Sequence, residues 1–304
     1  MMRYSKLAIM IIVAVMLILS MSAALAETTL SGLWKSGCDL LFHTENVTVT
    51  GEATFTLNEV KFKTALLDYT QDGRSSFYGL KLLTPRKDGT ERETGWTIIA
   101  DGEGDIFVME AYYPGTYRNG TGYANNTLLR HSIQLDALTE LGGSLAKQLE
   151  AMLPEDAFTV EGKTAHIKLN GDQIPPMAVS ALNVAAGYLS DRWFSYSHDR
   201  NVEEYEVAFD DYITVTQALT DGTVRWTLHD LDATVTVDDE GRLTAVQGSA
   251  CVSSTFLDGT VREVTVGFDL TMTDYGTSHV KPFDPAEYNV VLQREMFEEE
   301  DLQQ

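Results

Sequence analysis

The sequence predicts an α+β fold: a large curved antiparallel β-sheet, of half-barrel shape, with two or three helices packed on one face. Three observations predict it. Segments with alternating apolar and polar residues gather in two blocks, tight polar turns separate these segments, and two stretches with helical apolar spacing lie between the blocks. No linker rich in proline or glycine divides the blocks, so we expect a single domain over residues 27–292.

The first block begins with a helix and continues with strands. Leu30–Phe42 is expected to be helical because Leu33, Trp34 and Leu41 recur at helical spacing. Asp-Gly pairs at residues 72–73 and 88–89 indicate hairpin turns between the segments that follow. The expected strands of this block are residues 47–57, 60–69, 75–84, 94–100 and 105–112.

Two helices and a short strand are expected next, followed by the second block. Leucines at three- and four-residue steps predict a helix over residues 135–153, and a second apolar stripe predicts one over residues 174–193. The short strand between them is residues 158–169, and the strands of the second block are residues 205–215, 224–237, 242–256 and 261–275. The last strand alternates most clearly, with Val264, Val266, Phe268, Leu270 and Met272 on one face.

Both ends of the chain differ from the domain between them. Residues 1–26 have a basic start, a thirteen-residue apolar stretch and the small-residue ending Ala24-Leu25-Ala26, which is the pattern of a secretory signal peptide. An uncleaved membrane anchor stays open as the alternative, and it is the one membrane contact we expect. No cysteine follows the predicted cleavage site, so a bacterial lipid anchor is excluded. Residues 293–304 form an acidic tail that we expect to be flexible. The sequence therefore predicts a secreted or extracytoplasmic protein.

Composition and charge exclude several classes of protein. Hydrophobic residues make up 44% of the chain, which excludes a disordered or collagen-like protein. A net charge of −23 would be repelled by a phosphate backbone, so we expect no nucleic-acid partner. The two cysteines, Cys38 and Cys251, could form a disulfide in an oxidising compartment. Cys251 has the opposite alternation to the apolar Ala250, however, so two separate thiols remain equally open.

No sequence motif supports catalysis or metal binding. The histidines are never three or four residues apart, and the acidic segment 101–105 lacks the later glycine and carboxylate of a calcium loop. Ser144 is near a nucleophile-elbow pattern and an S-x-x-K pattern, but it lies inside a helical stripe and the partner motifs are missing. We therefore predict no catalytic residue, no metal and no cofactor. A hydrolase with two carboxylates remains a minor alternative, because sequence alone cannot place them.

Tyrosines are concentrated in residues 112–123, interleaved with residues that favour loops. Tyrosine combines an apolar ring with a polar tip, which suits the rim of a binding site. Tyr113 and Tyr117 are therefore candidate ligand contacts. The alternative is a loop that its rings hold against the outside of the sheet.

The order of elements resembles a known group. A helix leads into a strand that opens with NVTVTG at residues 46–51, and a meander, a helical insert and a second meander follow. The last strand ends in TDYG at residues 273–276 before PFDP at residues 282–285. This order, over most of residues 30–288, resembles the LolA/LppX-type half-barrel of bacterial extracytoplasmic lipid and lipoprotein carriers. The resemblance implies a hydrophobic cavity between sheet and helices and brings no catalytic residues. Many such carriers are lipid-anchored, and this chain departs from them in lacking the cysteine.

These observations lead to a functional hypothesis and an alternative. The first is a secreted, non-catalytic protein that binds a hydrophobic small molecule or lipid between its sheet and its helices. The alternative is an extracytoplasmic protein-interaction or sensory module of the same fold, which binds a protein partner and carries no ligand. The candidate lining residues of the first hypothesis are Leu182, Leu189, Trp193, Phe268, Leu270 and Met272.

Overall fold

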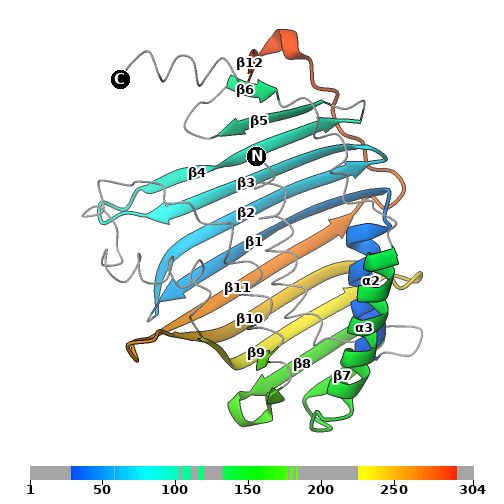
Figure 1. Cartoon of the computed structure of the whole chain (residues 1–304), viewed down its shortest axis with the longest axis vertical. Helices are drawn as coiled ribbons and strands as arrows, with labels where there is room; N and C mark the ends of the chain where they lie inside the picture. The colour runs from blue at the N-terminus through cyan, green and yellow to red at the C-terminus, as the bar shows by residue number, and fades with distance from the viewer. Residues whose placement is uncertain are drawn as a thin grey trace.

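In the computed structural model, a single wide sheet dominates the chain (Figure 1). The structure describes residues 29–57, 59–102, 105–110, 116–119, 133–176, 179–180, 183 and 225–292. Within these residues it contains a 12-stranded sheet in the order β12-β6-β5-β4-β3-β2-β1-β11-β10-β9-β8-β7. Neighbouring strands are antiparallel, except that β12 runs parallel to β6. The predicted α+β class and large antiparallel sheet are confirmed.

The elements have the following bounds. The helices are α2 (Leu30–Phe42) and α3 (Ile133–Glu150), with short 3-10 turns η1 (Gly171–Gln173) and η3 (Pro285–Glu287). The strands are β1 (Asn46–Leu57), β2 (Val60–Asp72), β3 (Ser75–Pro85), β4 (Glu91–Asp101), β5 (Ile106–Glu110), β6 (Thr116–Asn119), β7 (Phe158–Glu161), β8 (Thr164–Asn170), β9 (Arg225–Val237), β10 (Leu243–Thr255), β11 (Val261–Thr273) and β12 (Asn289–Leu292).

Strand β1 joins the two predicted blocks into one sheet. It pairs with β2 of the first block along one edge and with β11 of the second block along the other. Ala53, for example, lies between Ala65 and Phe268. Two meanders that are far apart in the sequence therefore share one continuous surface.

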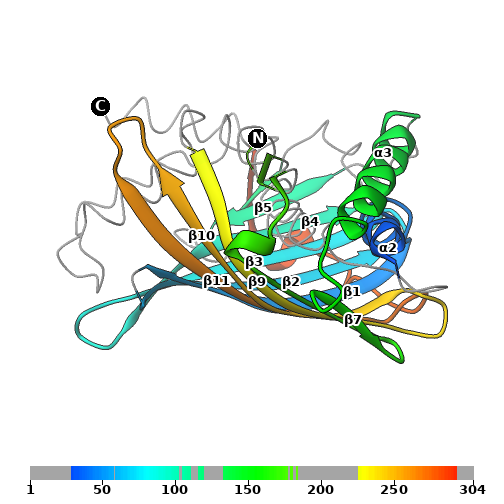
Figure 2. The same ribbon diagram turned by 90° about the horizontal axis from the view of Figure 1, so that it is seen from below.

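The sheet is curved, and α2 and α3 lie on its concave side (Figure 2). Glycines allow the strands to approach each other closely where side chains would collide. A Cβ on Gly95, whose φ is 144°, would lie 1.9 Å from the carbonyl oxygen of Leu80. A Cβ on Gly51 would lie 2.4 Å from the carbonyl oxygen of Asp269. Glycine inside a strand is typical of bends and of such close approaches.

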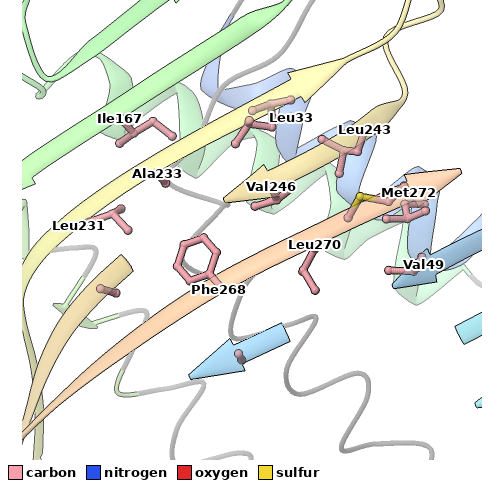
Figure 3. Close-up of a cluster of buried hydrophobic side chains, with 14 of the residues drawn as sticks. Leu33, Val49, Ile167, Leu231, Ala233, Leu243, Val246, Phe268, Leu270 and Met272 are labelled. Carbon is pink, nitrogen blue, oxygen red and sulfur yellow. The ribbon is translucent and has the colours of Figure 1, made fainter. Parts of the chain in front are cut away.

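The concave face carries the main hydrophobic core. We define this face by the side chains of Val49, Leu67 and Leu270, which are buried in that core. Leu33 of α2 belongs to the same buried cluster as Val246 and Met272, and the close-up labels all three (Figure 3). The opposite, convex face of β11 is polar. The alternate residues Glu263, Asp269 and Thr271 lie on it. The alternation predicted for residues 261–275 is therefore confirmed.

Helix α3 packs on α2, which crosses the sheet near the start of β10 (Figures 1 and 2). The indole Nε1 of Trp34 donates a hydrogen bond of 2.7 Å to the backbone oxygen of Thr139. Ser36 Oγ donates to the backbone oxygen of Gly241, in the turn between β9 and β10. The two helices are thus attached to each other and to one end of the strands.

Some local predictions need correction. Residues 158–169, predicted as one strand, form a hairpin of β7 and β8, because Gly162 turns the chain with a φ of 63°. The short strands β6 and β12 were not predicted. The predicted strand 205–215, the signal peptide 1–26 and the tail 293–304 lie outside the described residues. Of the predicted helix 174–193, residues 174–176, 179, 180 and 183 are described. Residues 176, 179, 180 and 183 are helical, whereas Ile174 is extended and ends η1, so the helix begins later than predicted.

No helix within the described ranges is long and apolar enough to cross a membrane.

Candidate ligand-binding face

Three of the predicted lining residues lie together on the concave face. Phe268, Leu270 and Met272 follow one another along β11, and each is 5% exposed or less. Figure 3 shows all three side chains in the buried cluster. Their partners on β1 are Ala53 for Phe268 and Val49 for Met272. Strand alternation thus brings these three predicted residues together as one apolar strip.

Small residues surround Phe268. Its neighbours across the sheet are Ala53 on β1 and Gly248 on β10, and the next residues outward are Ala65 on β2 and Ala233 on β9. We call these four residues the small-residue row. Because alanine and glycine rise little above the backbone, the concave face is shallow on both sides of the Phe268 ring.

Two tyrosines add polar groups to this apolar face. Tyr69 of β2 lies directly opposite Tyr78 of β3, and both are buried in the main core. The Tyr69 hydroxyl donates a hydrogen bond of 2.5 Å to Gln71 Oε1, and Gln71 Nε2 donates to the backbone oxygen of Gly73. The Tyr78 hydroxyl has no partner among the residues that the structure describes. Burial raises the pKa of both tyrosines, so each stays a neutral hydrogen-bond donor.

Tyr117 lies on the other face of the sheet. It belongs to a separate cluster with Ile99 and Phe107, on the face opposite Phe268. Its ring centroid is 4.7 Å from that of Phe283 and 5.0 Å from that of Tyr288, both in the segment after β11. Tyr117 therefore does not share a site with Phe268. Its position corresponds to the alternative interpretation, in which rings hold this part of the chain against the outside of the sheet.

The remaining predicted lining residues cannot be placed on the concave face. Leu182, Leu189, Trp193 and Tyr113 lie outside the residues that the structure describes.

The two cysteines are free thiols, so the disulfide that the sequence left open is absent. Cys38 is buried in α2, on the concave side, where its thiol is close to Thr139 of α3. Cys251 is paired with Thr265 and contacts Glu263 on the convex face. The sheet itself separates the two sulfur atoms. Burial raises the pKa of both thiols.

Few groups in the described part of the chain suit catalysis. Ser144, the near match to a nucleophile motif, donates its hydroxyl to the backbone oxygen of Glu140 within α3. A serine–histidine pair that the sequence did not indicate joins Ser253 Oγ and His229 Nε2 at 2.7 Å, between β9 and β10. No group of three or more histidine, cysteine, aspartate or glutamate residues that could hold a metal ion occurs in the described ranges. The concave apolar face is therefore the strongest candidate site.

Comparisons with known proteins leave the family open. No protein-family model matches the chain, and no curated protein matches it. Among solved structures, it is similar to a DUF1329 family protein from Desulfovibrio piger at 8% identity, over 84% of this chain and 94% of that one. The TM-score of 0.15 is too low for this similarity to support a common fold or function.

Proposed function

We propose that the protein is an extracytoplasmic, non-catalytic carrier that binds a hydrophobic ligand, such as a lipid, against the concave face of its sheet. In this proposal the curved sheet is a half-barrel of the LolA/LppX kind. The main support is the extent of the apolar concave face relative to the helices α2 and α3.

The helices cross the strands at one end only (Figure 1). A helix is about 10–12 Å wide, whereas the 12 residues of β1 span about 40 Å. Apolar side chains nevertheless line the concave face along the whole strand, from Val47 to Leu57. At the far end, Leu57 packs with Phe62 and Val264 in a cluster of its own. The apolar face is therefore much longer than α2 and α3 can cover. Val179, in the helical residues after Pro175, packs on it as well, and the face is buried in the folded chain. A hydrophobic ligand would replace part of this cover.

The small-residue row supports the same proposal. Its side chains are small and apolar, and this row lies in the middle of the sheet rather than under α2 and α3. The three alanines are 3% exposed or less, so a ligand beside Phe268 would take the place of the chain segments that cover them. Ligand sites in proteins are concave and mostly apolar, with few polar groups. The concave face has this composition.

The proposal is tested by filling the small-residue row. Purified protein is extracted with organic solvent and analysed for lipids by mass spectrometry, and the stripped protein is titrated with the neutral apolar dye Nile red. We expect co-purified lipid and saturable dye binding. Ala53→Leu should weaken dye binding at least about tenfold, because the added side chain occupies the row.

A matched control lies next to Ala53 on the same strand. Thr54→Leu adds a comparable side chain on the convex face, so dye binding should equal that of the wild type. Circular dichroism checks that both variants are folded. Absence of both lipid and dye binding in the wild type would contradict the proposal.

The second candidate function, a protein-interaction module, has one specific observation in its favour. Leu141 and Met152 are 58% and 56% exposed, and Leu145 between them is also exposed, along the outer side of α3 and the turn after it. Exposed apolar stripes of this kind are typical of interaction surfaces. Replacing both leucines by serine should abolish partner binding and leave lipid content unchanged if this function is the correct one.

A further inference from the structure

A buried hydroxyl without a partner marks one position on the concave face. The side chain of Tyr78 is 5% exposed, and its oxygen is shielded from solvent without any hydrogen-bond partner in the described part of the chain. Tyr69, directly opposite on β2, donates its own hydroxyl to Gln71. Two tyrosines thus lie side by side, and only the hydroxyl of Tyr69 has a hydrogen-bond partner in the described part of the chain.

An unpaired buried hydroxyl costs free energy, because the group loses its hydrogen bonds to water and gains none in the protein. Phenylalanine would fill the same space at Tyr78 without this cost. A ligand that brings a hydrogen-bond acceptor to the Tyr78 hydroxyl would remove the cost in the bound state.

The surroundings of Tyr78 determine which acceptor fits. On the concave face, the residues beside Tyr78 on the neighbouring strands are Tyr69, Val49 and Met272 on one side and Ile98 on the other. None of these side chains is charged. A carboxylate or phosphate buried beside Tyr78 would find no cation among these neighbours, and the burial of an unpaired charge is costly. A neutral hydrogen-bond acceptor, such as an ester carbonyl, suits these uncharged neighbours of Tyr78 better.

The position of Tyr78 relative to the small-residue row also fits an amphiphile. Tyr69 and Ala65 are four residues apart on β2, and they face Tyr78 and Leu82 on β3. This separation corresponds to about 13 Å along the strand. An acyl chain whose polar end lies at Tyr78 can therefore reach the small-residue row after about 13 Å along the strands.

We infer that the ligand is a neutral amphiphile, of the acylglycerol type, whose ester carbonyl accepts a hydrogen bond from Tyr78 while its acyl chain lies along the small-residue row. This inference rests on the carrier function proposed above and specifies the class of its ligand. Thr64 Oγ1 is a second buried hydroxyl without a partner among the described residues, but alternation from Ala65 directs it to the convex face.

The test compares three competitors of bound Nile red: monoolein, oleate and 1-octadecene, each delivered from cyclodextrin. Monoolein has the neutral ester, oleate has a charged head, and 1-octadecene has no acceptor. We expect the wild type to bind monoolein most tightly. Tyr78→Phe should weaken monoolein binding about tenfold, which corresponds to about 1.4 kcal/mol, and leave 1-octadecene binding unchanged.

Tyr69→Phe is the matched control. It removes a hydroxyl that already donates to Gln71, so it should lower the melting temperature of the ligand-free protein and leave the monoolein affinity within twofold of the wild type. Tyr78→Phe should not lower the melting temperature, because it removes an unpaired group.

The outcomes separate this inference from the carrier function. If the wild type binds the competitors but Tyr78→Phe changes monoolein and 1-octadecene binding equally, or changes neither, the inference is wrong and the carrier function stands. The same holds if oleate binds more tightly than monoolein. If the wild type binds none of them, both fail.

Discussion

The indole ring of Trp34 in α2 occupies the space that a side chain at Gly142 in α3 would need. A Cβ on Gly142 would lie 2.1 Å from Trp34 Cε2, whereas a Cβ on Gly143 would have its nearest neighbour 3.9 Å away. The adjacent hydrogen bond from Trp34 to Thr139 fixes the ring in this position. Gly142, two residues before Ser144, therefore has a structural role: it lets the two helices pack closely.

This contact predicts opposite effects for two neighbouring substitutions. Gly142→Ala should lower the free energy of unfolding by about 1–3 kcal/mol, because the new methyl group pushes the helices apart. Gly143→Ala should raise it by up to about 1 kcal/mol, since alanine favours the helix and meets no obstacle. Urea denaturation measures both values. Equal effects of the two substitutions would contradict the packing described for Trp34.

The ion pair of Asp238 and Arg242, in the turn between β9 and β10, should make the stability of the protein depend on pH. Partial burial would raise the pKa of Asp238, but hydrogen bonds from the backbone and side chain of Arg242, with the charge of that arginine, lower it below its usual range. Because the pKa of Asp238 is lower in the folded state, its carboxylate stabilises the fold fully above the unfolded-state pKa of about 3.9. This stabilisation is lost as the pH falls through the lower folded-state pKa.

Asp238→Asn tests this pH dependence, because it keeps an acceptor oxygen and removes the charge. The variant should be less stable than the wild type at pH 7, by no more than about 1 kcal/mol for this partly exposed ion pair. The difference should shrink when urea denaturation is repeated at pH 3 and below. A difference that is the same at both pH values would count against the Arg242 interaction.

The cysteines predict a specific pattern of thiol reactivity. Under non-reducing conditions, unfolded protein should show two free thiols with Ellman's reagent. In the native protein, Cys251 should react slowly and Cys38 should react only on unfolding, because burial shields Cys38 and raises its pKa. Dithiothreitol should leave the melting temperature unchanged. Fewer than two thiols in the unfolded protein would show that a disulfide had formed.

The segment after β11 predicts a local effect on the edge of the sheet. Phe283 stacks on Tyr288 at 5.1 Å and lies 4.2 Å from Phe107 on the convex face. Phe283→Ala should destabilise the protein by about 1–3 kcal/mol and reduce the hydrogen-exchange protection of β12 more than that of β11. Tyr288→Ala should have a smaller effect, because Tyr288 is itself exposed at the outside of the cluster. Equal loss of protection in β11 and β12 would argue against a local role.

Much of the fold follows from periodicity in the sequence. The helix Leu30–Phe42 was predicted with its observed bounds, and alternation placed Phe268, Leu270 and Met272 on one face. Such patterns are local, and burial of one face reinforces them along the whole element. Strands β6 and β12 have four residues each, too few to show a pattern, and their parallel pairing joins segments that are about 170 residues apart.

The candidate site was harder to predict than the fold. The side of the sheet on which Tyr117 lies depends on its register with β5, which composition does not reveal. The unpaired hydroxyl of Tyr78 is a property of the packed structure, because the sequence does not state which donors find acceptors. Neither tyrosine could therefore be assigned its role from residue type alone.

The pairing of β1 with β11 has a consequence for how the protein is made. Residues 46–57 leave the ribosome early, yet their partner strand, residues 261–273, is synthesised about 200 residues later. Until then one edge of β1 has no neighbour, and contacts between such distant segments form slowly. A chain that ends before Val261 would expose this edge permanently, so truncated products should aggregate and require chaperones.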